Sequence, residues 1–260
     1  MPCPHEDVES EAQHLASSSS PSEHQEFHSI LGPPAGAVLI AERLRRSVAG
    51  KKLLPTLSFR LKPGQILFFT GPSGCGKSTA LRLIANLDPP DADSGSITLG
   101  SLTPEELTSP VWRSRVMYVP QSRVSQTGTP ANLFERAAKF AVRAADPIRL
   151  TVEQDLLPVC AKIGISEAQA HQEWQQLSGG QAQRASLAIA LALQPNVLLL
   201  DESTSALDEK ATILVESLIR EVCANSGMSV IWVSHDVLQP LRLGLSASKD
   251  CINFATLKGN

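Results

Sequence analysis

Apolar residues along the chain form short runs that alternate with longer, partly polar stretches. Short apolar runs bounded by turn-forming residues are typical of buried strands, and longer amphipathic stretches are typical of helices. Strands that alternate with helices indicate a largely parallel sheet covered on both faces. We predict strands at 38–40, 57–61, 66–70, 96–99, 116–119, 197–200 and 230–233, and helices at 81–87, 132–145, 181–193 and 210–223. The stretch 122–176 is predicted to be mainly helical, with 132–145 its clearest helix.

The first 36 residues have a different composition from the rest of the chain. They contain no Lys or Arg, several acidic residues and the run Ser17-Ser18-Ser19-Ser20. Such a segment buries too little apolar surface to offset its ordering entropy. Residues 1–36 are therefore predicted to be a disordered, acidic, serine-rich tail. The tail lacks the basic start and apolar centre of a signal peptide.

Composition narrows the class of protein. No apolar run approaches the ~18–20 residues that cross a bilayer. The five cysteines are scattered and odd in number, which favours free thiols in a reducing compartment. The net charge of -3 argues against a protein dominated by phosphate contacts to nucleic acid. We expect a cytoplasmic protein with no direct nucleic-acid binding.

A glycine-rich segment follows the apolar run 66–70 and precedes the predicted helix 81–87. Its glycines let successive backbone N–H groups point at phosphates, and a helix N-terminus adds a positive dipole. Lys77 is expected to bind the β- and γ-phosphates, and the Ser78 hydroxyl to bind Mg²⁺. The segment fits the phosphate-loop pattern and reads Gly71-Pro72-Ser73-Gly74-Cys75-Gly76-Lys77-Ser78-Thr79.

Two consecutive acids end the apolar run 197–200. Ligands bind at the carboxyl ends of strands in open α/β sheets, and buried acids are costly unless a cation or proton offsets them. We expect Asp201 to hold Mg²⁺, through water, and Glu202 to polarise the attacking water as general base.

A further motif, Leu177-Ser178-Gly179-Gly180-Gln181, precedes the predicted helix 181–193. Together with the phosphate loop and the strand that ends in Asp201, this motif resembles the signature of the ATP-binding-cassette family, and the resemblance covers most of residues 37–240. It implies that Ser178, Gly179, Gly180 and Gln181 bind nucleotide.

The resemblance also implies a fold. It predicts a P-loop NTPase of the α/β class, with a mainly parallel sheet flanked by helices. An N-terminal antiparallel β subdomain and an inserted helical subdomain at about 122–180 would complete it. The ATPase domain would span 37–245, followed by a C-terminal segment at 246–260.

Three more positions gain roles from the resemblance. Gln121 matches the glutamine that senses Mg²⁺ and the γ-phosphate and couples to the membrane partner. The segment 205–208 matches the loop that crosses the dimer interface. His235 matches the switch histidine on the γ-phosphate. The expected catalytic set is therefore Lys77, Gln121, Glu202 and His235, and the expected metal set is Ser78, Gln121 and Asp201.

The family resemblance implies partners as well as a site. Two cassettes, as a homodimer or cassette dimer, would hold Mg-ATP between the phosphate loop of one and Ser178 of the other. A separate membrane permease would carry the substrate, with this chain peripheral on the cytoplasmic face of the membrane. The segments 203–209 and 231–236 resemble small cassettes of bacterial iron-efflux and plant aluminium-tolerance transporters, which suggests metal-related export.

The sequence departs from the family pattern at the position that stacks on adenine. The aromatic residue that stacks on adenine in this family is missing, and Arg45 or Arg46 is a candidate replacement.

Two alternative functions remain open. The first alternative is a soluble cassette protein acting on nucleic acid or ribosomes, but tandem cassettes and a long coiled-coil insertion are missing. The second is a nucleotide-binding regulator that no longer hydrolyses, against which Lys77, Asp201, Glu202 and His235 argue.

Overall fold

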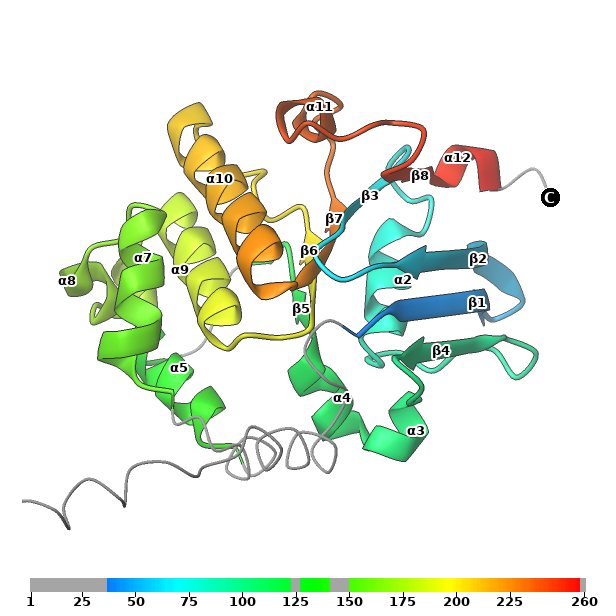
Figure 1. The fold of residues 1–260 in the computed structure, drawn as a ribbon, viewed down its shortest axis with the longest axis horizontal. Helices are drawn as coiled ribbons and strands as arrows, with labels where there is room; N and C mark the ends of the chain where they lie inside the picture. The colour runs from blue at the N-terminus through cyan, green and yellow to red at the C-terminus, as the bar shows by residue number, and fades with distance from the viewer. Residues whose placement is uncertain (1–36, 123–126, 141–149, 258–260) are drawn as a thin grey trace, which may run out of the picture.

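Five parallel strands form the central sheet of the molecule (Figure 1). The computed structural model describes residues 37–122, 127–140 and 150–257. The strand order is β5-β6-β7-β3-β8. The predicted strands in this sheet are confirmed, but β8 was not predicted because three residues are too few to show a pattern. The bounds are β3 Ile66–Thr70, β5 Val116–Val119, β6 Val197–Asp201, β7 Ser229–Val233 and β8 Cys251–Asn253.

A second, antiparallel sheet has the strand order β2-β1-β4. Its strands are β1 Leu39–Val48, β2 Lys51–Leu61 and β4 Ser96–Leu99. β4 has its predicted bounds, whereas the predictions at 38–40 and 57–61 cover only one end of β1 and one end of β2. Elsewhere in this hairpin Leu44 and Leu54 are also buried, but charged or exposed neighbours such as Lys52 interrupt the apolar pattern of a buried strand.

The central sheet is buried on both faces, and alternate residues of each strand enter different cores. Leu67 and Phe69 of β3 join the core shared with β1, β2 and α2 (Lys77–Ile84). Phe68, between them, joins the core on the other face and stacks on Trp232 of β7, with ring centroids 5.6 Å apart. This burial on two faces explains why the strands read as continuous apolar runs.

Helix α2 lies between the two sheets and begins at the phosphate loop. It starts earlier and ends earlier than the predicted helix 81–87, because small and polar residues form its first turn. Trp112 of α4 is buried and donates its indole N–H to the carbonyl of Ile84, 2.9 Å away, at the end of α2. The two short helices after β4 are α3 Pro104–Leu107 and α4 Ser109–Arg115.

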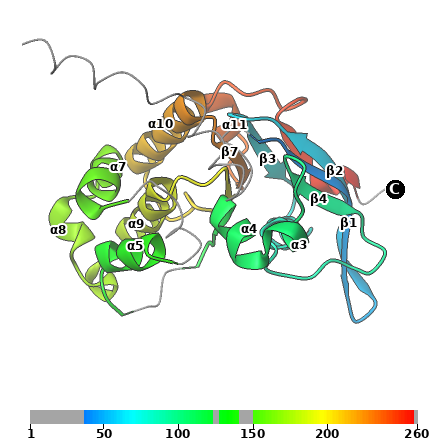
Figure 2. The same ribbon diagram turned by 60° about the horizontal axis from the view of Figure 1, so that its bottom comes forward.

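The segment between β5 and β6 is helical in its described residues. Figures 1 and 2 place α5, α7 and α8 on the side of the molecule opposite β1, β2 and β4. The helix predicted at 132–145 is α5, which ends at Ala138, and 141–145 lie outside the described residues. The elements are α5 Pro130–Ala138, the π-helical turn η1 Val152–Leu156, α7 Leu157–Lys162, α8 Glu167–Ala170, the 3₁₀ turn η2 Trp174–Gln176 and α9 Gly179–Ala192.

Three helices complete the chain: α10 Glu209–Ser226, α11 Gln239–Arg242 and α12 Phe254–Leu257. α10 is longer than the prediction at 210–223, since Asp208 caps its start and Gly227, with φ 72°, follows its end. Within the described ranges, no helix combines the length and apolarity needed to cross a bilayer. The tail predicted at 1–36 lies outside the described residues, and the proposed domain limits stay predictions.

Candidate active site

The loop between β3 and α2 has a backbone that requires glycine. Gly76 directly precedes α2 and has φ 105°. A Cβ atom at Gly76 would lie 2.4 Å from the Leu53 carbonyl oxygen, closer than non-bonded atoms approach. Gly74 also has a positive φ of 72°, but nothing lies within 4 Å of a Cβ built there. The close contact with β2 therefore leaves no room for a side chain at position 76, whereas backbone conformation alone favours glycine at position 74.

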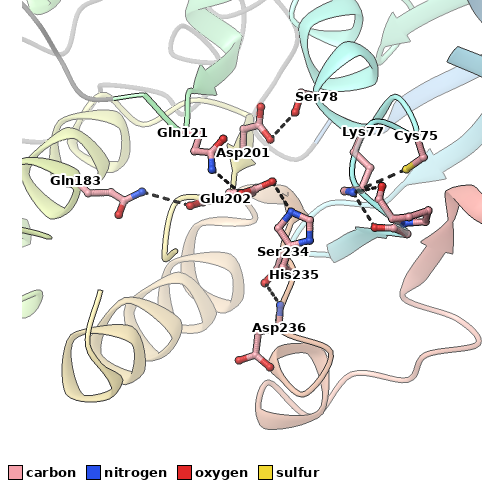
Figure 3. Close-up of polar contacts among 12 residues, drawn as sticks. Cys75, Lys77, Ser78, Gln121, Gln183, Asp201, Glu202, Ser234, His235 and Asp236 are labelled. Atoms are coloured by element: carbon pink, nitrogen blue, oxygen red, sulfur yellow. Dashed lines mark hydrogen bonds and ion pairs between the residues drawn. The ribbon is translucent and has the colours of Figure 1, made fainter. Parts of the chain in front are cut away.

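Lys77, the first residue of α2, is buried, with a relative exposure of 5%. Its ammonium group donates to the carbonyl oxygens of Gly71, at 2.8 Å, and Pro72, at 2.9 Å. It also lies 3.8 Å from Cys75 Sγ. The charge is thus held inside the loop that carries it, as Figure 3 shows.

Asp201, the last residue of β6, is buried between two hydroxyl donors. Ser78 Oγ donates to Asp201 Oδ1 at 3.0 Å, and Tyr118 Oη donates to Oδ2 at 2.8 Å. Burial of Tyr118 and its hydrogen bond to Asp201 raise the pKa of the Tyr118 hydroxyl well above its usual value. Tyr118 is therefore a stable donor at neutral pH. Motifs in the sequence predict Ser78 and Asp201, but no motif predicts the role of Tyr118.

Glu202 lies at the centre of a second polar cluster (Figure 3). Gln121 Nε2 donates to Glu202 Oε2 at 2.6 Å, and His235 Nε2 lies 2.7 Å from Glu202 Oε1. These residues follow β5, β6 and β7, so adjacent parallel strands bring them together at one edge of the sheet. Glu202 and His235 also line a cavity of about 430 Å³.

Ser178 caps α9 and is exposed. Its hydroxyl accepts from the Gln181 N–H at 3.3 Å, and Gln181 Oε1 accepts from the Ser178 N–H at 2.8 Å. Among the described residues, no hydrogen bond joins positions 178–181 to the phosphate loop. One chain therefore brings the phosphate loop, Asp201, Glu202, Gln121 and His235 together, but it does not bring Ser178 into that cluster.

The loop after His235 is tied to α10 by a charged network. Arg242 of α11 donates to Asp236 Oδ2 and to Glu216 Oε1, each at 2.7 Å. Glu216 is buried within α10, and the guanidinium offsets its charge. Arg220 Nη2 in turn donates to the Arg242 carbonyl at 2.7 Å. No sequence pattern predicts this network, because its members are spread over two helices and a loop.

The ABC transporter family model matches residues 54–205. This stretch holds the phosphate loop, Gln121, the segment 177–181 and the Asp201-Glu202 pair, and it exceeds half of the 260 residues. The chain belongs to the ABC transporter family.

Curated relatives from this family are ATP-binding proteins of import systems. The chain is 36% identical over 217 residues to an aliphatic sulfonates import ATP-binding protein of Agrobacterium fabrum, covering 80% of this chain and 74% of the relative. It is 35% identical over 193 residues to an Fe(3+) ions import ATP-binding protein of Rhodococcus jostii, covering 74% of this chain. The chain spans only 53% of that second relative.

A solved structure extends the likeness to the fold. A bacterial Atm1-family ABC exporter with ATP bound has a TM-score of 0.65 and 25% sequence identity, covering 81% of this chain and 36% of that one. The predicted fold class is confirmed: an ABC ATPase with a parallel sheet, an antiparallel sheet and flanking helices.

The side chains of this ABC ATPase fit a magnesium–nucleotide complex. Mg²⁺ prefers oxygen ligands, and Ser78 and Asp201 place a hydroxyl and a carboxylate 3.0 Å apart beside the phosphate loop. The side-chain amide of Gln121 is hydrogen-bonded to Glu202, the residue that follows Asp201. Glycines with positive φ shape the loop, and the loop leads directly into the N-terminus of α2. A phosphate-binding loop has this arrangement.

The two arginines considered for adenine stacking differ in their surroundings. Arg45 Nη1 donates to Asp93 Oδ2 at 2.6 Å, so its guanidinium is already engaged. Arg46 is opposite Leu54 in the β1–β2 pairing. The Leu54 Cα lies 3.5 Å from the position of a Cβ on Gly76, which brings the Arg46 backbone near the phosphate loop. A hydrogen bond from Arg82 and the charge of Arg46 lower the pKa of Asp88, which lies beyond the end of α2. Adenine stacking by either arginine stays a prediction.

Proposed function

We propose that this ABC ATPase binds and hydrolyses Mg-ATP and drives a transporter through a separate membrane permease. The observation that carries the proposal is the convergence of two clusters at the end of β6. Ser78 and Tyr118 hold Asp201, while Gln121 and His235 hold Glu202. Lys77 begins α2 directly after the adjoining phosphate loop. A nucleotide-binding regulator without hydrolysis would not need Glu202 and His235 paired at 2.7 Å.

Each side chain has a proposed part in this reaction. Ser78, Asp201 and Gln121 would hold Mg²⁺, which when bound supplies electrostatic stabilisation of phosphate charge. Lys77 would exchange its bonds to the Gly71 and Pro72 carbonyls for the β- and γ-phosphate oxygens of ATP. The backbone N–H groups of the segment 71–79 would bind the remaining phosphate oxygens.

Glu202 is the proposed general base, positioned from both sides of its carboxylate. General-base catalysis contributes typically ~10²–10⁴-fold in rate. Gln121 and His235 each bind one carboxylate oxygen, so the group has a defined orientation before it accepts a proton from water. His235, 46% exposed at its side chain, is free on its outer side to contact the γ-phosphate.

A second cassette would complete the site as part of a homodimer or cassette dimer. The segment Ser178 to Gln181 lies at the start of α9, where N–H groups and the helix dipole favour an anion. Because Ser178 is exposed and is not joined to its own phosphate loop, we propose that it faces the γ-phosphate held by the partner subunit.

The cargo belongs to the permease, and metal-related export stays a prediction. The names of relatives include import systems for Fe(3+) ions, aliphatic sulfonates and spermidine/putrescine. The cargoes named for these relatives differ, which supports a cargo that is set by the permease rather than by the cassette. We propose a peripheral position on the cytoplasmic face of a membrane, where the chain would co-purify with a multispanning permease.

Replacement of the general base tests the proposed function. The chain should release phosphate from ATP in the presence of Mg²⁺, and Glu202→Gln should lower this rate at least ~10²-fold while nucleotide binding is retained. The matched control is Glu221→Gln, which removes an exposed carboxylate of α10 that pairs with Lys162. Hydrolysis by Glu202→Gln at the wild-type rate would refute the role of Glu202. A wild-type chain without ATPase activity, alone or with its co-purified permease, would refute the proposed function.

A further inference from the structure

Gln183 of α9 links the Glu202 backbone to the loop that follows it. Its Nε2 donates to the Glu202 carbonyl at 3.3 Å, and its Oε1 accepts from the Ala206 N–H at 3.3 Å. One side-chain amide thus binds the backbone on both sides of the turn at 203–205. Figure 3 shows the bond to Glu202. The residue lies two positions beyond the signature segment, in the first half of α9.

The backbone that Gln183 binds is conformationally unusual. Glu202 has φ 49°, in the left-handed region that residues other than glycine adopt uncommonly. Its N–H donates to the Val233 carbonyl at 3.0 Å, and its carbonyl accepts from the Ser205 N–H at 3.0 Å as well as from Gln183. Such a conformation persists only where the surroundings determine it, and functional sites concentrate such residues.

The direction of α9 explains why this contact forms. The helix runs antiparallel to β6, the strand that follows it, so its first half lies beside the end of the strand. From Gln183 to Ala192 the helix rises about 14 Å, and the five residues of β6 extend about 16 Å. Gln183 therefore reaches the level of Glu202, whereas its neighbour Ala182 is buried in the core with the helical segment.

We propose that Gln183 is a positioning residue for the general base Glu202. The proposal rests on the proposed function. α9 carries the signature segment and packs against α5, η1 and α7. A displacement of these helices is therefore transmitted through the Gln183 amide to the Glu202 backbone and to the loop at 203–207. In this way, engagement of the signature segment by a second cassette sets the orientation of the carboxylate on the first.

Two substitutions separate the two hydrogen bonds. Gln183→Met keeps the length of the side chain and removes both bonds. Gln183→Glu keeps the acceptor for the Ala206 N–H but removes the donor to the Glu202 carbonyl. Both variants should lower kcat at least about tenfold, since small misplacement of a catalytic group is costly in rate. KM for ATP and the dissociation constant for ATP without Mg²⁺ should change less than about twofold.

A double-mutant cycle shows whether Gln183 acts through Glu202. In the Glu202→Gln background, single-turnover hydrolysis should be insensitive to Gln183→Met, because the base that Gln183 positions is already lost. The matched control is Gln154→Met, at an exposed glutamine of η1, which should retain wild-type kcat. Thermal unfolding of each variant checks folding, and the polar Gln183→Glu keeps the test valid if Gln183→Met is unstable.

Three results would overturn the inference. The first is wild-type kcat in both Gln183 variants while Glu202→Gln is inactive, which leaves the proposed function intact. The second is a parallel loss of ATP affinity and rate, which indicates a merely structural residue. The third is an equal further loss of rate in the Glu202→Gln background. A wild-type chain that does not hydrolyse ATP removes the proposed function and this inference together.

Discussion

Gly76 shows at the scale of one residue how packing restricts the phosphate loop. Alanine there would combine a φ of 105° with a Cβ 2.4 Å from the Leu53 carbonyl oxygen. We expect Gly76→Ala to lower the free energy of unfolding by more than about 1 kcal/mol and to weaken ATP binding. Gly74→Ala, at φ 72° with open space around its Cβ, should cost less. Urea unfolding and nucleotide titration of both variants measure the difference, and equal losses would contradict the packing argument.

Residues with recognisable chemistry could be predicted from the sequence, whereas their supporting partners could not. The phosphate-loop pattern and the acidic end of an apolar strand single out Lys77 and Asp201 because those positions carry a motif. Tyr118 and Gln183 lie in ordinary elements and act through one hydroxyl or one amide. Their positions follow only from strand register and helix direction, which sequence patterns do not specify.

At the scale of elements, apolar runs predicted what is buried and missed what is half exposed. The central strands bury both faces and were found almost to the residue, whereas the charged half of β1 was not. Helix ends were displaced where small or polar residues begin a helix, as in α2 and α9. The short elements β8, α3 and α12 have too few residues to give a periodic signal.

The loop between β7 and α11 should give a pH-dependent contribution to stability. Partial burial would raise the pKa of Asp236, but hydrogen bonds from Arg242 and the Leu238 N–H outweigh it and hold the pKa below the usual 3.8. A lowered pKa in the folded state means that stability is present above pH 3.8 and is lost as pH falls through the folded-state pKa.

Asp236→Asn isolates this contribution. At pH 7 the substitution should lower the free energy of unfolding by less than about 1 kcal/mol, since the Asp236–Arg242 pair is partly exposed. The difference from wild type should shrink as the pH falls below 3.8 towards the folded-state pKa, because the carboxyl is then increasingly protonated. Urea unfolding from pH 3 to pH 7 measures it. A difference that persists unchanged at pH 3 would show that Arg242 does not act through the Asp236 charge.

At the scale of the whole molecule, one predicted component of the site, Ser178, does not join the other site residues within one chain. Ser178 is exposed and its hydroxyl accepts the capping bond from the Gln181 N–H, and among the described residues no hydrogen bond joins it to the cluster at the end of β6. A two-fold symmetric dimer would bring these parts together. If the phosphate loop of the first subunit contacts Ser178 of the second, symmetry makes the reverse contact as well. Each of the two sites would use the phosphate loop of one chain and the Ser178 of its partner.

Mixing two inactive chains tests this arrangement directly. Lys77→Ala disables the phosphate loop, and Ser178→Asp keeps a good helix cap while placing a negative charge against the γ-phosphate. In a mixed dimer one site holds both lesions and the other holds neither. Random pairing should therefore restore about a quarter of wild-type phosphate release if the two sites act independently. Ser178→Asn, an equally good but neutral cap, should keep activity alone. If each site lay within one chain, the mixture would stay as inactive as its components.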